Sequence, residues 1–437
     1  MHFQSTRDAR HVVGLSDAIA RGLAPDGGLY VPVALPSLPI DRFAGAESIV
    51  DVARRLLRPF VAGDVLEPQL DAITADAFDF PAPVVDVERA PGPLSVLELF
   101  HGPTAAFKDF GARFLAASLE RIPRTDPRRL TILVATSGDT GGAVAAAFHR
   151  RPWVDVVVLY PKGLVSARQE KQLACWGDNV RTLSVTGTFD DCQRMVKEAF
   201  VDAELAKAVL LSSANSINVG RLLPQMVYYA RTSLALWRRD GRAPNFIVPT
   251  GNIGNVAACL WAREIGLPIG EIVLATNANQ TVPDYLRTGD WQPRPSVATL
   301  ASAMDVGNPS NMERLRWLFQ DVDGLRTKIS AQSVSDDEIR TAIRRDYAEW
   351  GQVWCPHTAT AAEVYRRLPA ARRAERWVLV ATAHPAKFND VVEPLVGVDV
   401  PVPQALADLL ALPSIQQEVA PRLDELRAVL MTGSARA

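Results

Sequence analysis

Short apolar segments alternate with helix-like stretches along most of this chain. Continuous apolar runs predict buried strands at residues 94–99, 130–135, 154–160, 245–249, 271–275 and 377–381. Apolar residues at helical spacing predict helices over 107–119 and 141–148. Apolar strands that alternate with helices form mostly parallel sheets with both faces covered, and these sheets bind ligands beyond the carboxyl ends of their strands. The pattern predicts an α/β fold whose functional residues lie in turns that follow strands.

The first 85 residues follow a different pattern. Turn-forming residues are frequent up to Pro39, including the sequence PDGG at 25–28, and a helical pattern then runs over 49–60. The sequence FPAP at 80–83 is typical of a boundary between structural units. We therefore expect residues 1–85 to form a small N-terminal domain.

Composition and charge change this picture little. The 437 residues are 48% apolar and 22% charged, and 47 basic against 49 acidic residues leave a formal net charge of -2. These values are ordinary for a globular chain. The chain has neither the basic excess that favours nucleic-acid binding nor a polybasic run of the kind that binds membrane surfaces. We expect no nucleic-acid partner and no membrane partner.

Targeting and metal signals are equally sparse. The polar start MHFQSTRDARH lacks the apolar core of a signal peptide, and no apolar run is long enough to span a bilayer. A cytoplasmic location is the expectation. The four cysteines include no CxxC pair and their spacing fits no zinc module, so we expect reduced, mostly buried thiols and no metal site.

A glycine-containing turn, TGNIGN at 250–255, follows one predicted strand and leads into a predicted helix. Glycines let backbone N–H groups converge on a ligand, and a helix N-terminus favours an anion. The turn is neither a Walker loop nor a GxGxxG motif. A phosphate cradle and a tight strand-to-helix turn both remain open.

A second turn, TSGDTGG at 136–142, has the same strand–turn–helix context. Its hydroxyls and free N–H groups are suited to a carboxylate or a phosphate. Asp139 would repel a bound anion unless it accepts a hydrogen bond from some other group. Because Ser, Thr and Asp are all favoured at helix N-caps, a cap cluster is the alternative.

A lysine, Lys108, lies in the apolar-rich sequence HGPTAAFKDFG at 101–111, near a predicted helix start. Burial lowers the pKa of a lysine, and a neutral lysine is a nucleophile that can form a Schiff base. A solvated surface charge is the alternative.

Two further segments carry candidate chemistry. In ATAHPAKF at 381–388, Thr382 can present a hydroxyl at a strand end, and His384 is either a base, a ligand or a satisfied structural histidine. In NSINVGR at 215–221, Arg221 suits bidentate phosphate or carboxylate binding, or is an ordinary surface arginine at a helix start.

Together these features describe one kind of site. A pyridoxal phosphate site needs an imine-forming lysine, a phosphate cradle, a clamp for the substrate carboxylate and a partner for the pyridine nitrogen. The lysine, the two turns and the late threonine supply that set.

Several long blocks, in order from about residue 22 to 388, closely resemble the threonine synthases, pyridoxal-phosphate enzymes of the tryptophan synthase β-like group. The blocks are GLAPDGGLYVP at 22–32, HGPTAAFKDF at 101–110, TSGDTG at 136–141, AMDVGNPSN at 303–311 and TAHPAKF at 382–388. The resemblance implies a fold type II enzyme with two open, mostly parallel twisted sheets covered by helices. It also implies a large cofactor domain over 86–125 and 242–437 and a smaller domain over 126–241.

The implied reaction converts O-phospho-L-homoserine and water to L-threonine and phosphate by γ-elimination and then β-addition of water. Lys108 would hold the cofactor as a Schiff base and transfer protons, Thr382 would meet the pyridine nitrogen, and Asp139 would lie near the cofactor's 3′-oxygen. The phosphate cradle would comprise Gly251, Asn252, Ile253, Gly254 and Asn255. Ile253 and Asn255 depart from the expected GNFGD, which puts a side-chain role for the last position in doubt.

The substrate carboxylate would face Thr136, Ser137, Gly138 and Thr140. From their charge and position, Arg221, Lys162 and Asn218 are candidates for holding the substrate phosphate. The family contains monomers and homodimers, and both remain open. The alternatives are a threonine dehydratase, a cysteine synthase-like enzyme, a non-catalytic cofactor-binding paralogue or a plain phosphate-binding module.

Overall fold

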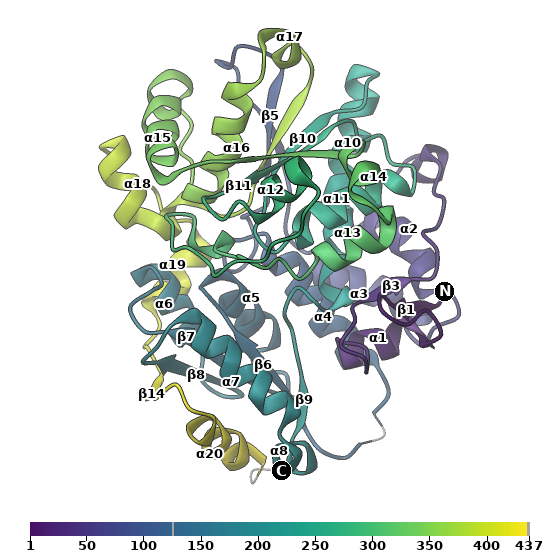
Figure 1. The fold of residues 1–437 in the computed structure, drawn as a ribbon, viewed down its shortest axis with the longest axis vertical. Helices are drawn as coiled ribbons and strands as arrows, with labels where there is room; N and C mark the ends of the chain where they lie inside the picture. The colour runs from purple at the N-terminus through teal and green to yellow at the C-terminus, as the bar shows by residue number, and fades with distance from the viewer. Residues whose placement is uncertain (125, 435–437) are drawn as a thin grey trace.

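Three sheets organise the computed structural model, which describes residues 1–124 and 126–434 (Figure 1). The N-terminal unit has a small antiparallel sheet of order β2-β1-β3 packed with helices. Its elements are β1 Phe3–Ser5, β2 Val12–Val13, α1 Leu15–Arg21, β3 Tyr30–Pro32, η1 Ile40–Phe43, α2 Ile49–Val61, η2 Glu67–Gln69 and α3 Leu70–Ala77. The helix predicted over 49–60 is α2, whose apolar stripe is buried.

The largest sheet has six strands in the order β12-β11-β10-β13-β5-β4. All neighbours are parallel except β4, which runs antiparallel to β5 at the edge. The strands are β4 Val84–Asp86, β5 Leu94–Glu98, β10 Asn245–Pro249, β11 Ile272–Thr276, β12 Ile329–Ser333 and β13 Trp377–Ala381.

Both faces of this sheet are buried, as the continuous apolar runs require. Alternate residues of one strand enter different cores. Phe246 and Val248 belong to the core that includes α10 (Gln225–Asp240) and α11 (Gly254–Glu264), whereas Ile247 belongs to the core that includes α15 (Asp336–Trp350) and α16 (Pro356–Arg367). The helices of this part are α4 Lys108–Arg121, α9 Val219–Leu222, α10 Gln225–Asp240, α11 Gly254–Glu264, α12 Thr281–Thr288, η3 Ser302–Met304, α13 Met312–Phe319, α14 Val322–Arg326, α15 Asp336–Trp350, α16 Pro356–Arg367, α17 Ala370–Arg373, η4 Pro385–Phe388 and α18 Asn389–Val396.

The third sheet is smaller and wholly parallel, with the order β14-β8-β7-β6-β9. Its strands are β6 Leu130–Ala135, β7 Val154–Pro161, β8 Val180–Val185, β9 Leu210–Ser212 and β14 Gln417–Val419. The associated helices are α5 Asp139–Phe148, α6 Ala167–Ala174, α7 Phe189–Val201, α8 Ala203–Ala208, α19 Gln404–Ala411 and α20 Leu423–Ser434. The predicted fold class is therefore confirmed.

The C-terminal segment differs from the predicted domain division. We placed residues 242–437 together in the large domain, but β14 pairs with β8 of the smaller sheet and α20 packs on α7 and α8. Figure 1 shows this yellow segment running down the side of the smaller sheet. The prediction failed because β14 is a short, largely exposed edge strand without an apolar run. Similarly, α10 from the predicted smaller domain packs on α11 and α2.

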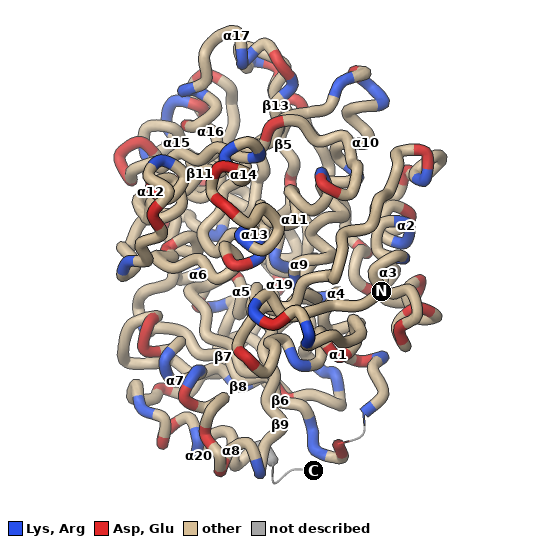
Figure 2. Tube along the Cα trace, turned by 45° about the vertical axis from the view of Figure 1, so that its right-hand side comes forward, with Lys and Arg blue, Asp and Glu red and all other residues tan. Residues whose placement is uncertain are grey.

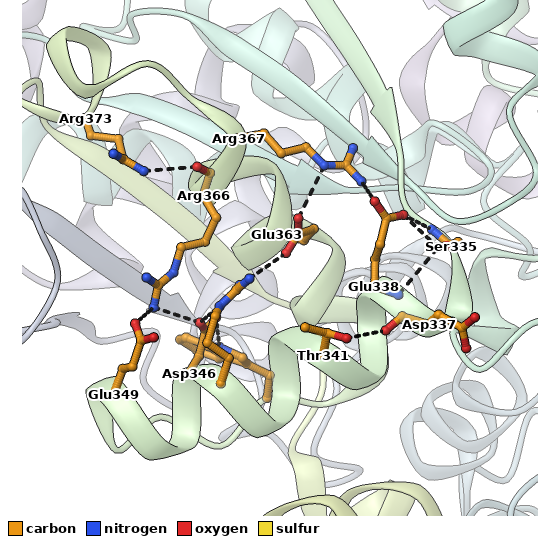
Figure 3. A network of polar contacts seen from close by, with 12 residues as sticks. Ser335, Asp337, Glu338, Thr341, Asp346, Glu349, Glu363, Arg366, Arg367 and Arg373 are labelled. Carbon is orange, nitrogen blue, oxygen red and sulfur yellow. Dashed lines mark hydrogen bonds and ion pairs between the residues drawn. The ribbon is translucent and has the colours of Figure 1, made fainter.

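A polar network fixes α16 against α15 (Figure 3). Arg366 pairs with Asp346 at 3.0 Å and with Glu349 at 2.7 Å. Arg367 pairs with Glu338 at 2.5 Å and with Glu363 at 3.4 Å. The network sets the direction of α16, whose first turn faces the site described below.

Surface charge is mixed over the whole molecule. Figure 2 shows Lys and Arg interspersed with Asp and Glu along the trace rather than gathered by sign. None of the helices in the described part of the chain combines the length and apolar character that a bilayer crossing needs.

Candidate active site

Lys108 is the first residue of α4 and reaches the site from the loop after β5. In this loop Ala105 has a left-handed backbone with φ 53°, and its carbonyl accepts a hydrogen bond from the N–H of His384 at 3.0 Å. The N–H of Phe107 donates to the carbonyl of Thr382 at 2.8 Å. These bonds join the loops after β5 and β13, so that Lys108 and Thr382 lie at the same edge of the large sheet.

The amine of Lys108 is enclosed by protein, although part of the side chain stays accessible. Within residues 1–124 and 126–434, this amine has no hydrogen-bond acceptor. Burial lowers the pKa of Lys108 to about 8, the carboxylate of Asp139 opposes this shift, and the charges of Lys387 and Arg221 add to it. The neutral amine is therefore roughly one tenth of the total at pH 7, far more than for an ordinary lysine, which suits a nucleophile and a base.

The turn between β10 and α11 is a closely packed stretch of backbone. Gly251 packs so closely that an added Cβ would lie 2.6 Å from the Cα of Met304. Ile253 has a left-handed backbone with φ 64°. The N–H groups of residues 251–255 have no acceptor in the described part of the chain. Free N–H groups at a helix N-terminus are what a phosphate needs.

The asparagine side chains of this turn point into the protein. Asn252 donates to the hydroxyl of Ser216 at 2.6 Å and accepts from the N–H of Ser310 at 2.6 Å. Asn255 accepts from the hydroxyls of Tyr228 and Tyr229 at 2.6 and 2.8 Å. Both side chains thus hold the cradle in shape, and the backbone remains free for a ligand.

The turn between β6 and α5 is held by its first hydroxyl. Thr136 accepts hydrogen bonds from the N–H groups of Gly138 and Gly141 at 3.0 and 2.9 Å and donates to the carbonyl of Gly138 at 3.0 Å. Gly138 has φ 134°, which requires glycine. The hydroxyls of Ser137 and Thr140 have no partner among the described residues, so they remain available to a ligand.

Asp139 is buried at the start of α5, and its Oδ1 has two protein partners. Its carboxylate pairs with the ammonium of Lys387 at 2.8 Å and accepts from the amide of Gln169 at 3.0 Å. Burial alone would raise the pKa of Asp139, but the charges of Lys387 and Lys108 outweigh it and hold this pKa well below its ordinary value. Asp139 is therefore ionised.

The two candidates after β13 have different surroundings. Thr382 is buried, and its hydroxyl has no partner within the described ranges. His384 accepts from the N–H of Ala386 through Nδ1 at 3.2 Å and packs edge-on against Phe100. Burial lowers the pKa of His384 to about 4. Of the three interpretations of His384, a satisfied structural histidine fits these contacts.

The three candidates for the substrate phosphate are already bonded to protein. Arg221 is buried and donates to the carbonyls of Ala214 and Lys108. The amide of Asn218 donates to the carbonyl of Ile19 at 2.9 Å and accepts from the N–H of Gly220. Lys162 is exposed and pairs with Glu418 at 2.6 Å. In these positions Arg221 and Asn218 support the start of α4 and its neighbour α9.

Two residues near Lys108 escaped sequence reasoning. His357, in the first turn of α16, is buried, accepts from the N–H of Ala303 at 3.1 Å through Nε2, and leaves Nδ1 without a partner. Burial lowers the pKa of His357 to about 4. Lys387 has no solvent exposure and donates to the carbonyl of Thr104 at 2.8 Å. Lys387 lies inside the block TAHPAKF at 382–388, so the family resemblance could have pointed to it. His357 lies in no such block, and a single histidine carries no motif that would have found it.

These groups fit pyridoxal phosphate. The cradle offers five free N–H groups to its phosphate. The unpaired amine of Lys108 suits its aldehyde carbon, and the free hydroxyl of Thr382 suits its ring nitrogen.

Comparison with known proteins agrees with this assembly. A family model described as pyridoxal-phosphate dependent enzyme matches residues 79–383. Two others, described as threonine synthase N terminus and threonine synthase, C-terminal, match residues 2–78 and 358–430. The threonine synthase of Haemophilus influenzae is 40% identical over 99% of this chain and 100% of its own length. That of Escherichia coli K12 is 39% identical over 99% of both.

Solved structures give the same result. The threonine synthase of Escherichia coli has a TM-score of 0.90 and 38% identity, covering 99% of this chain and 100% of its own. The pyridoxal-phosphate-bound threonine synthase of Brucella melitensis has a TM-score of 0.92 and 35% identity, covering 100% of both chains. The fold and these matches thus define a pyridoxal-phosphate-dependent lyase, a class that the lysine and the cradle fit. Within this class the chain belongs to the threonine synthase family, and the dehydratase, cysteine synthase and non-catalytic alternatives are not favoured.

Proposed function

We propose that this chain converts O-phospho-L-homoserine and water to L-threonine and phosphate. The observation that carries the proposal is Lys108: a buried amine without a protein acceptor in the described part of the chain, at the same sheet edge as a free phosphate cradle and close enough to Asp139, between the free hydroxyls of Ser137 and Thr140 in sequence, to feel its charge. Such a site can hold a cofactor phosphate on one side and an amino-acid carboxylate on the other.

Lys108 performs the proton transfers in this proposal. Pyridoxal phosphate, when bound, supplies a ring that accepts electron density from the substrate α-carbon. The amine of Lys108 takes the α-proton as general base. A β-proton then leaves and phosphate departs from the γ-carbon. The hydroxyl of water ends on the β-carbon, and protons return to the α- and γ-carbons.

The carboxylate contacts come from the turn after β6. Ser137 and Thr140 donate their hydroxyl protons, together with backbone N–H groups, to the substrate carboxylate. Thr136 and Gly138 keep the turn in the required shape.

The substrate phosphate needs cations of its own. Arg221, Asn218 and Lys162 already have protein contacts, although the Nε of Arg221 has no partner among the described residues. A cleft of about 700 Å³, lined in part by Ser310, whose N–H donates to Asn252 of the cradle, offers two other cations, Lys197 from α7 and Arg316 from α13. Neither pairs with a carboxylate in the described part of the chain. We propose that the substrate enters through this cleft and that these two side chains attract its phosphate.

The test measures phosphate release and L-threonine formation from O-phosphohomoserine by the purified protein and by Lys108→Ala. Equal amounts of both products from the wild type, with none from the variant, support the proposal. Formation of 2-oxobutanoate from L-threonine, or of cysteine from O-acetylserine and sulfide, without phosphate release would replace it by one of the alternatives.

We further propose a cytoplasmic enzyme that is a monomer or a homodimer. The four cysteines are buried and free, and burial raises the pKa of Cys192 to about 12, which suits inert thiols in a reducing compartment. Light scattering on the purified protein distinguishes the two assembly states.

A further inference from the structure

The turn after β6 carries a negative charge where the proposed function places anionic ligands. Asp139 lies between Gly138 and Thr140, in the turn proposed to receive the substrate carboxylate. A carboxylate in a low-dielectric site repels a second anion strongly. Some group must therefore balance Asp139 before the turn can accept an oxyanion.

Lys387 is that group by geometry. Its ammonium lies 2.8 Å from Oδ1 of Asp139 and 2.8 Å from the carbonyl oxygen of Thr104. The Lys387 side chain is 0% exposed and that of Asp139 is 4% exposed. A buried pair at this distance, supported by further hydrogen bonds, behaves as a neutral unit.

The pair also joins the two α/β parts of the molecule. Asp139 follows β6 of the smaller sheet, whereas Lys387 follows β13 of the large sheet. Around it, Ser166 of the α6 cap donates to the carbonyl of Lys387 at 2.8 Å, and Gln172 of α6 donates to the carbonyl of Thr104 at 3.0 Å. The charge pair is thus held in register from both sides.

Charged and titratable groups from five elements act on the amine of Lys108, on Asp139 or on Lys387. They are Lys108 and Asp109 on α4, Asp139 on α5, Lys387 on η4, Arg221 on α9 and His357 on α16. Lys387 is the one in contact with Asp139, so its removal changes the charge next to Lys108 most directly.

We infer that Lys387 is a positioning residue that neutralises Asp139 and so lets the turn at 136–140 accept an oxyanion, from either cofactor or substrate. This inference rests on the proposed role of that turn. Without Lys387, Asp139 becomes an unpaired buried carboxylate that repels the ligand. With both charges removed, the repulsion disappears as well.

The experiment compares Lys387→Met, Asp139→Asn and the double variant, with Lys207→Met as control. Lys207 is an exposed lysine paired with Glu204 at 3.0 Å, so the control makes the same substitution in a surface pair. Absorption titrations give the dissociation constants for pyridoxal phosphate and, on the loaded enzyme, for L-threonine. They also give the pH at which the visible band of the lysine-bound cofactor titrates.

We expect Lys387→Met to weaken oxyanion binding about tenfold or more and to move the band titration up by about one pH unit, because uncompensated Asp139 favours the proton on nitrogen. In the double variant, the dissociation constants should return to within about threefold of the wild-type values. If only the affinity for pyridoxal phosphate falls, the turn at 136–140 binds an oxyanion of the cofactor. If only the affinity for L-threonine falls, the turn binds the substrate carboxylate.

Unchanged binding in Lys387→Met overturns the inference. So does a double variant that is as weak as the single variant or fails to fold. If only Lys387→Met fails to fold, the folded double variant supports charge balance. None of these readouts requires turnover of O-phosphohomoserine, so a failure of the proposed function is seen separately in the phosphate-release assay.

Discussion

The backbone N–H of Phe107 donates to the carbonyl oxygen of Thr382 at 2.8 Å. This one bond sets the residue before Lys108 against the residue that follows β13. Because it uses backbone atoms on both sides, the side chain of Thr382 can be changed without removing it. The hydroxyl of Thr382 is thus separable from the architecture that positions it.

Substitution of Thr382 tests how a neutral partner for the ring nitrogen controls the reaction. Thr382→Asp replaces a hydroxyl by a carboxylate, which holds a pyridinium proton through a charge-assisted bond. We expect the share of 2-oxobutanoate among the products to rise about tenfold, the effect of ~1.4 kcal/mol. Thr382→Val serves as the neutral control. Unchanged rate and product ratio in Thr382→Asp would show that the ring nitrogen lies elsewhere.

The cradle predicts a sharp steric effect at Gly251. An added methyl group would lie 2.6 Å from the Cα of Met304, so the backbone of the turn must move. Overpacking of this kind costs about 1–3 kcal/mol, or roughly 5- to 150-fold in affinity. Gly251→Ala should therefore lose pyridoxal phosphate on gel filtration. Gly142→Ala is the matched control, because its Cβ meets no atom closer than 3.7 Å. Equal cofactor retention in the two variants would contradict the proposed cradle.

The sequence predicted the elements that carry the site better than those at the edges. Strands predicted at 130–135 and 245–249 are β6 and β10 at those bounds. In contrast, β12 (ISAQS) and β14 (QEV) were not predicted, because edge strands need no continuous apolar run.

The same distinction holds for the site. Turns at strand ends were predictable from parallel-sheet geometry, which brings them to one edge. The pairing of Asp139 with Lys387 was not, because it joins two different sheets and depends on how they pack. Likewise, the unpaired Nδ1 of His357 becomes visible only once α16 is placed.

The α15–α16 network predicts a stability effect outside the site. Asp346 has no solvent exposure and accepts hydrogen bonds from Arg345, Arg366 and Trp354 at 2.9, 3.0 and 3.1 Å. Asp346→Ala leaves the indole N–H of Trp354 without an acceptor and removes one of the carboxylate partners of Arg345 and of Arg366, so we expect a loss of about 2–3 kcal/mol in unfolding free energy. Asp337→Ala on the same helix, whose carboxylate is 96% exposed, should change little. Denaturant unfolding measures both, and equal values would refute the role of the buried carboxylate.

The lowered pKa of Lys108 predicts how cofactor uptake depends on pH. An ordinary lysine has a pKa of 10.5, and burial lowers that of Lys108 to about 8. At pH 7 the neutral fraction is then roughly one tenth, against roughly one in three thousand for the ordinary value. The rate at which the visible band forms after adding pyridoxal phosphate to apoenzyme should rise with pH and level off above about pH 8. A rate still rising tenfold per unit at pH 9 would mean that the amine is not shifted.

The same shift has a consequence for the apoenzyme. Between pH 8 and 10.5 the folded state binds fewer protons at Lys108 than the unfolded state does. The contribution of Lys108 to the free energy of unfolding therefore rises with pH between pH 8 and 10.5. Denaturant unfolding of the wild type and of Lys108→Met, which has no amine to titrate at this position, isolates this contribution.

The two cations of the cleft predict a change in substrate affinity rather than in chemistry. Lys197 and Arg316 line the cleft from α7 and α13, and neither forms an ion pair in the described part of the chain. A dianionic phosphate entering between them gains from both charges, and exposure limits the gain from each. We expect Lys197→Gln and Arg316→Gln each to raise KM for O-phosphohomoserine about three- to tenfold, with kcat nearly unchanged.

Added salt should reduce the wild-type kcat/KM more than that of either variant. Lys207→Gln controls for loss of a surface charge. A fall in kcat without a change in KM would instead assign these cations to a step after binding, and the entry route through this cleft would be wrong.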